Sequence, residues 1–131
     1  MNRLLAGAAA AAAVVSMNAQ AQDNFPNRPV RIVVPFSAGS ATDILARTVA
    51  ARLTEAWGQQ VLSDNRPGAL GIIGTELMLK ANPDGHTMLM VSSGHAANAT
   101  LAAKLPFDTV KDFSGIAPVA IVPNVLVVSP S

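Results

Sequence analysis

The sequence contains no cysteine, which excludes disulfide bridges, thiolate zinc sites and thiol chemistry. Aromatic residues make up only 4% of the 131 residues, and the formal net charge is +1. Nucleic acid requires a clustered basic surface, so this composition argues against it as a partner. The two histidines stand without a paired acidic cluster, and no metal site is predicted. The fold must therefore rest on an apolar core alone.

Long apolar runs are also scarce. The stretch from Leu4 to Val15 is shorter than the ~20 residues of a membrane span. Arg3 precedes it and Ala19-Gln20-Ala21 offers a small-residue cleavage site, a pattern typical of a secretory signal peptide over residues 1–21. The alternative is a short membrane anchor. Cleavage would leave residues 22–131 as one soluble domain outside the inner membrane, with equal numbers of basic and acidic side chains.

From residue 28 onward, strand-like and helix-like segments alternate. Runs of β-branched and apolar residues predict strands over residues 28–36, 59–65 and 86–93. Two more apolar runs follow, Ile116 to Val122 and Val125 to Val128. Strands alternating with helices indicate an α/β fold with a mostly parallel sheet and helices on both faces.

Two helices are predicted between these strands. The first begins after Ser40, which stands three residues before Asp43 in the spacing of a capping box, and it ends at Gly58. Its apolar stripe is expected to consist of residues at i+4 steps, widened by two alanines: Leu45, Val49, Leu53, Trp57, Ala46 and Ala50. The second helix is predicted from Ile72 to Lys80, with Ile73 and Leu77 facing inward.

Three small-residue segments follow the three strands: Phe36 to Thr42, Asn65 to Gly71, and Ser92 to Asn98. Ligands of parallel sheets bind at the carboxyl ends of strands. Side by side, these loops would line one crevice.

The first of these loops has no lysine or arginine and only one glycine, so it matches neither a phosphate-binding P-loop nor a dinucleotide fingerprint. The start of a helix nevertheless carries unpaired N–H groups and a partial positive charge. Ser37, Ser40 and Thr42 could add hydroxyl donors for an anion. The alternative is that the glycines of these loops only turn the chain.

Charged residues near the crevice favour structural roles. Asp43 is expected to reach back to the Ser40 N–H as a cap, in preference to contacting a ligand. Arg66 could pair with a ligand carboxylate, but a surface salt bridge with Asp64 is the preferred interpretation.

Ser92, Ser93 and His95 raise the alternative of a secreted α/β hydrolase. The segment SSGHA lacks the G-x-S-x-G elbow of such enzymes, so hydrogen bonds from Ser92, Ser93, His95 and Asn98 to a ligand are favoured over catalysis.

The segments RPVRIVVPFSAGSATDILAR, NRPGALGIIGTE, ANPDGHTMLM, GHAANATLAAKLPFDTVKDF and VPNVLVVSPS, taken in this order, closely resemble the start of Bug-type periplasmic substrate-binding proteins. These are the receptors of tripartite tricarboxylate transporters. The resemblance implies a type II periplasmic-binding-protein fold, of which this chain would be lobe one. It also implies a small carboxylated ligand, two integral membrane subunits as partners, no cofactor and no enzymatic activity.

By the same resemblance, neutral donors hold one ligand carboxylate. The implied ligand-lining positions are Phe36, Ser37, Ala38, Gly39, Ser40, Thr42, Asp43, Gly68, Ala69, Ser92, Ser93, His95 and Asn98.

The chain departs from the family pattern in three respects. Gly39-Ser40 replaces a Gly-Gly pair, and Leu70-Gly71-Ile72 replaces Gly-Gly-Asn. The chain is also shorter than the family, and it is expected to be a truncated member that lacks the second lobe. A further alternative is therefore a non-binding remnant, unfolded or self-associating through strands around Val119 to Val128.

Overall fold

The computed structural model describes residues 25–102, 104–121, 123 and 125–128, so the predicted signal peptide lies outside the described residues. Three strands form one parallel sheet in the order β2-β1-β3. They are β1 (Val30–Val34), β2 (Val61–Asn65) and β3 (Thr87–Leu89). Val30 stands opposite Val61 and Ile32 opposite Met88. The predicted α/β class with a parallel sheet is confirmed.

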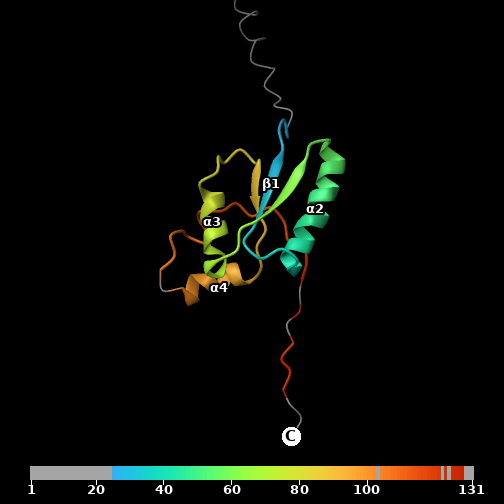
Figure 1. Cartoon of the computed structure of the whole chain (residues 1–131). Coiled ribbons are helices and arrows are strands. Elements are labelled where there is room, and N and C mark those ends of the chain that lie inside the picture. The colour runs from blue at the N-terminus through green and yellow to red at the C-terminus, as the bar shows by residue number, and fades with distance from the viewer. Residues whose placement is uncertain (1–24, 103, 122, 124, 129–131) are drawn as a thin grey trace, which may run out of the picture.

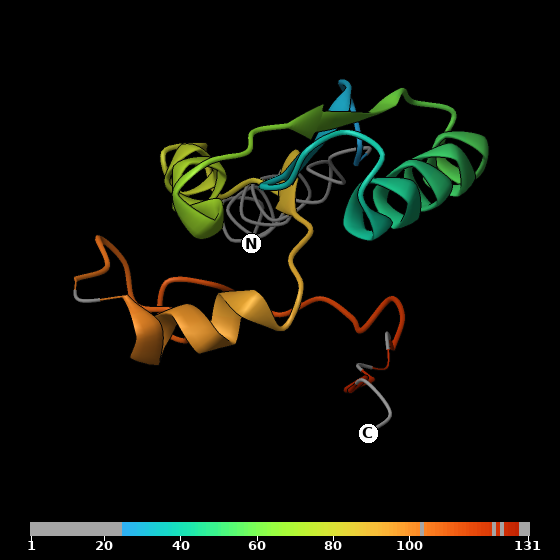
Figure 2. The same ribbon diagram turned by 60° about the horizontal axis from the view of Figure 1, so that its bottom comes forward.

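The helices within the described ranges are α2 (Ala41–Trp57), α3 (Ile72–Leu79) and α4 (Gly94–Leu101), and a 3₁₀ turn, η2 (Ala69–Gly71), leads into α3. Figure 2 shows α2 and α3 on opposite faces of the sheet. The connections β1 to β2 and β2 to β3 run in opposite directions across the sheet, and right-handed crossovers then place their helices on opposite faces. The strand β1 lies between β2 and β3 and is the central strand of the sheet.

The core is built around β1, which is covered on both faces. Val30, Ile32 and Val34 pack with Ala46 and Ala50 of α2, which together with Val61 form the buried cluster. Alternation along the strand turns Val33 to the α3 side, where its side chain is also fully buried. Burying each such branched side chain contributes about 1.5–3 kcal/mol.

The contact between α2 and the sheet centres on small residues. Ala46 and Ala50 are buried, whereas the four larger residues of the predicted stripe are only half-buried: Leu45, Val49, Leu53 and Trp57. Both predicted ends of the helix are confirmed. Ser40 Oγ accepts a hydrogen bond from the Asp43 N–H at 3.2 Å, and Gly58 has φ +64°.

The inward face of α3 differs from the prediction. Ile73 is 51% exposed, while Gly74 and Thr75 are buried. A Cβ at position 74 would lie 2.9 Å from Pro35 Cβ, so glycine lets this helix approach the chain just after β1. The face of α3 that lies against the chain after β1 therefore carries its smallest residue, Gly74, and Ile73 points towards solvent.

The last part of the chain holds fewer strands than predicted. β3 ends at Leu89, and α4 begins at Gly94, so the predicted strand over 86–93 and loop over Ser92 to Asn98 were both too long. Residues 104–121, 123 and 125–128 contain no strand, and the apolar side chains of Ile121 and Leu126 are more than 90% exposed.

The strands expected around Val119 to Val128 are thus not formed in the described part of that segment. Strands require a paired neighbour, and Pro118 and Pro123 interrupt the run. Residues 125–128 lie away from the sheet and the helices (Figure 1). Within the described ranges, every helix is too short or too polar to cross a membrane.

Candidate functional site

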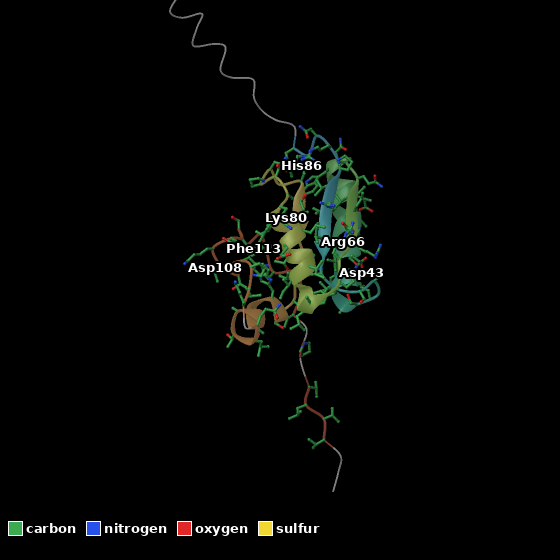
Figure 3. All side chains as sticks on the ribbon, turned by 60° about the vertical axis from the view of Figure 1, so that its left-hand side comes forward. Asp43, Arg66, Lys80, His86, Asp108 and Phe113 are labelled. Carbon is green, nitrogen blue, oxygen red and sulfur yellow. The ribbon has the colours of Figure 1, made fainter. Side chains whose placement is uncertain are left out.

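The candidate site lies at the edge where the three parallel strands end, the lower edge in Figure 1. Figure 3 shows Asp43 towards this end of the sheet and His86 towards the opposite end. Two hydrogen bonds join the segments that follow the strands. Asn65 Nδ2 donates to the Phe36 carbonyl at 3.1 Å, and Asn98 Nδ2 donates to the Leu70 carbonyl at 2.9 Å. The three predicted segments are thus linked at one edge.

The loop after β1 presents neutral donors to solvent. Ser37, Ala38 and Gly39 are exposed, and Gly39 has φ +83°, a conformation that favours glycine. The Ser40 N–H is used within the loop, donating to the Ser37 carbonyl at 3.2 Å. Ala41 and Thr42 are the first two residues of α2, where N–H groups have no acceptor within the helix. Phe36 and Thr42 are half-buried at the two ends of this loop.

Asp43 turns its carboxylate into the protein, where it is 2% exposed. Oδ2 accepts hydrogen bonds from the Gly39 N–H at 2.8 Å and from Arg47 Nε at 3.0 Å, and Oδ1 accepts from Asn65 Nδ2 at 3.0 Å. The capping role is confirmed, but the predicted partner, the Ser40 N–H, was wrong. That N–H closes the turn with Ser37, which leaves the Gly39 N–H for the carboxylate.

These contacts fix the charge of Asp43. The hydrogen bond from Arg47, followed by that from the Gly39 N–H, lowers the pKa of Asp43 from its ordinary 3.8 to about 2. The carboxylate is therefore ionised at neutral pH, and its charge is balanced by the Arg47 guanidinium in a 3.0 Å ion pair. The Asp43 carboxylate therefore lies beside the neutral donors of the loop. Its repulsion of an incoming anion is offset by the positive charge of Arg47.

Sequence reasoning missed Asn65 and Arg47 as members of this site. Arg47 Nη2 donates to Asn65 Oδ1 at 3.0 Å, which closes a network of three side chains from α2 and β2. Two signals could have found them. Arg47 follows Asp43 at the i+4 spacing of helix ion pairs, and Asn65 is the last residue of the strand adjoining β1.

The segment after β2 has an unusual backbone. Gly68 has φ +130°, and Ala69 and Leu70 also have positive φ, although neither is glycine. All three are exposed. Arg66 Nε donates to both carboxylate oxygens of Asp64, at 2.9 and 3.1 Å, which confirms the predicted salt bridge.

Of the four ligand-lining residues predicted after β3, two precede α4 and two belong to it. Ser92 and Ser93 are exposed just before α4. His95 and Asn98 belong to α4 instead of the predicted loop. The His95 ring stacks on Phe107 at 5.9 Å between centroids and meets Phe113 edge-on at 5.1 Å. These contacts give His95 a packing role and provide no support for the hydrolase alternative.

The described residues do not enclose the site. Two hollows, of about 350 and 220 Å³, lie elsewhere: one is lined by residues from Ala99 to Thr109, and the other by residues around Phe25 and His86. Ser37, Gly68 and Ser92, one from each loop, are exposed, so the three loops present an open surface. Within the described ranges, no three His, Asp or Glu side chains gather as metal ligands.

Comparison with known proteins identifies relatives of this chain. The family model described as "Tripartite tricarboxylate transporter family receptor" matches residues 45–131. A relative from Pseudomonas sp. (strain P51), the UPF0065 protein in the tcbD-tcbE intergenic region, is 44% identical over 126 residues, covering 96% of this chain and 38% of its own length. BugT of Bordetella pertussis is 39% identical over 82% of this chain and 34% of its own length. The chain thus spans little more than a third of these relatives.

Solved structures agree with this result. The periplasmic binding protein BugD superposes with a TM-score of 0.64 at 36% identity, over 68% of this chain and 30% of its own. MatC from Rhodopseudomonas palustris with bound malate gives 0.63 at 38% identity, over 68% and 31%. Another R. palustris protein, solved with adipate, gives 0.62 at 41% identity, over 65% and 29%. This chain belongs to the receptor family of the tripartite tricarboxylate transporters, and its solved neighbours include a periplasmic binding protein.

Proposed function

We propose that this chain forms the first lobe of a periplasmic receptor that captures a small carboxylated solute and delivers it to integral membrane transporter subunits. Its role is binding and delivery, without chemical turnover. One observation carries the proposal: the exposed loop after β1 offers neutral hydrogen-bond donors at the start of α2, next to a carboxylate, Asp43, that Arg47 already neutralises.

The physical basis is the helix start itself. Its partial positive charge contributes about 0.3–1 kcal/mol to anion binding when exposed and up to about 2 kcal/mol when partly buried. The Ala41 and Thr42 N–H groups and the hydroxyls of Ser37 and Thr42 would add hydrogen bonds to one carboxylate group. The binding of malate and adipate, both dicarboxylates, by two structural neighbours supports this ligand class.

The rim of the proposed site comes from the other two segments. Gly68 and Ala69 after β2, and Ser92 and Ser93 after β3, are exposed at the same edge of the sheet. They would contact the remainder of the solute. On an open surface the carboxylate stays hydrated, so high affinity would require a second lobe that closes over it.

The periplasmic location rests on the proposed signal peptide. Export of the chain with cleavage after Ala21 would give a mature protein that begins at Gln22. Mass spectrometry of the protein from a periplasmic extract measures that terminus directly. A mature form that still contains Leu4 to Val15 would instead support the membrane anchor.

Isothermal titration calorimetry of the chain with mono-, di- and tricarboxylates tests the binding proposal. Ser37→Asp places a negative charge at the exposed loop, and Ala51→Asp places the same charge on the exposed face of α2. We expect Ser37→Asp to abolish the heat of carboxylate binding and Ala51→Asp to retain it. Heat from neutral sugars or from cations, with none from any carboxylate, would refute the proposal.

A further inference from the structure

We propose that Asn65 and Arg47 are positioning residues for the carboxylate site: they fix the shape of the loop after β1 and cancel the charge of Asp43, so that the loop's donors can receive an anion. The inference rests on the function proposed above, because it concerns the same site. Neither residue belongs to the loop itself, since Arg47 lies in α2 one turn beyond Asp43 and Asn65 ends β2.

The hydrogen-bond network of Asp43, Arg47 and Asn65 holds the loop after β1 at two residues. Asn65 Nδ2 holds the Phe36 carbonyl at 3.1 Å, and Asp43 Oδ2 holds the Gly39 N–H at 2.8 Å. Ser37 and Ala38, which are exposed, lie between these two points. A loop fixed on both sides loses less conformational freedom when a ligand binds, and its donors point in a defined direction beforehand. The network therefore acts on the ligand through the loop.

The chemistry of the network requires an amide at position 65. Asn65 uses Nδ2 as the donor to Asp43 and Phe36, and Oδ1 as the acceptor from Arg47. Aspartate at this position would bring a second carboxylate against Asp43 and against a carbonyl oxygen, with no donor for either. Leucine would leave the partners unpaired.

Arg47 contributes charge and geometry together. Its Nε contacts Asp43 Oδ2 and its Nη2 contacts Asn65 Oδ1, both at 3.0 Å, which uses the fork of the guanidinium. Removing this cation would leave the Asp43 charge uncompensated at the helix start that is proposed to receive an anion. Lysine would restore the charge, but a single ammonium group does not reproduce the fork.

Five variants of the full chain test this inference: two that alter the network, two matched controls and the conservative Arg47→Lys. Asn65→Asp and Arg47→Gln alter the network. Gln60→Glu adds the same negative charge before the opposite end of β2, and Arg52→Gln removes a cation from α2 whose partner is Glu55. Malate affinity is measured by calorimetry. The Gly39 amide proton is followed by NMR without ligand, because its chemical shift reports the bond to the Asp43 carboxylate.

We expect Asn65→Asp and Arg47→Gln to weaken malate binding by about tenfold or more and to change the chemical shift of the Gly39 amide proton. Gln60→Glu and Arg52→Gln should stay within about twofold of the unmodified chain, with Gly39 unmoved. Arg47→Lys should give an intermediate affinity. Should Asn65→Asp fail to fold, the comparison of Arg47→Gln with Arg47→Lys carries the test.

Unchanged malate affinity in both network variants would overturn the inference, as would an equal loss in the controls. If the unmodified chain binds no carboxylate, the proposed function fails, and the Gly39 resonance then decides the network separately. A Gly39 shift that is the same in all variants overturns the network, and a shift confined to Asn65→Asp and Arg47→Gln supports it.

Discussion

Gly74 in α3 offers a sharp test of how this fold positions its candidate site. A Cβ at this position would lie 2.8 Å from the Arg66 carbonyl oxygen, 2.9 Å from Pro35 Cβ and 3.0 Å from Pro35 Cα. Two of these three atoms belong to the backbone, and the third belongs to a rigid proline ring. In Gly74→Ala, the helix must therefore move away from the chain that leads from β1 into the proposed binding loop.

Two effects of opposite sign decide the magnitude. Alanine is favoured over glycine inside a helix by about 1 kcal/mol. Ordinary carbon contacts begin near 3.4 Å, so the new methyl group requires a shift of about half an ångström against backbone, and overpacking of this kind costs about 1–3 kcal/mol. Since Gly74 is buried, we expect the steric effect to dominate, with a net destabilisation of up to about 2 kcal/mol.

Thermal unfolding of the full chain measures this change, because 1 kcal/mol corresponds to about 4–8 °C for a domain of this size. Gly94→Ala is the matched control: it also lies in a helix, and its Cβ would meet only Ser92 Oγ at an ordinary 3.5 Å. The control should stabilise the fold by up to about 1 kcal/mol, which would raise the melting temperature slightly. A rise in Gly74→Ala similar to that of the control would refute the steric reasoning.

Three further predictions concern the core, the pH dependence and the salt bridge. Ile32→Ala, which opens a cavity in the buried cluster, should cost about 2–5 kcal/mol in denaturant unfolding, and a loss below 1 kcal/mol would show that the site is not buried. Because the folded pKa of Asp43 is lowered to about 2, its contribution to stability is complete above the unfolded pKa near 3.8 and is lost as the pH falls towards 2. Asp43→Asn should therefore flatten the acid limb of a stability–pH curve, and an unchanged limb would contradict this. Arg66→Gln should leave carboxylate affinity within about twofold by calorimetry, because Arg66 pairs with Asp64; a large loss would mean that Arg66 contacts the ligand.

The sequence predicted the elements whose signals are local. The β-branched run of β1 predicted a buried strand, and the Ser40 cap and Gly58 terminus are set by the chemistry of single residues. The capping role of Asp43, though not its partner, and the Arg66–Asp64 pair were also predictable, since each depends on residues at most four positions away.

Features that depend on contacts between distant segments were missed or misplaced. Asn65 meets Asp43 across 22 positions of sequence, and no local pattern marks that pairing. Ile73 was predicted to face inward from its hydrophobicity, but the close approach of Gly74 to Pro35 decides the orientation of α3. Strands were expected around Val119 to Val128, but none forms in the described part, where these residues lack a paired neighbour.

The most direct test of the central claim is an amide NMR titration of the chain with malate at neutral pH. We expect the largest shifts at the start of α2 and in the loop before it, at Ala38, Ala41 and Thr42, and little change at the far end of the helix near Trp57. Malate binding that shifts only α4 and the residues around Phe107, or no shifts at any malate concentration, would contradict the account.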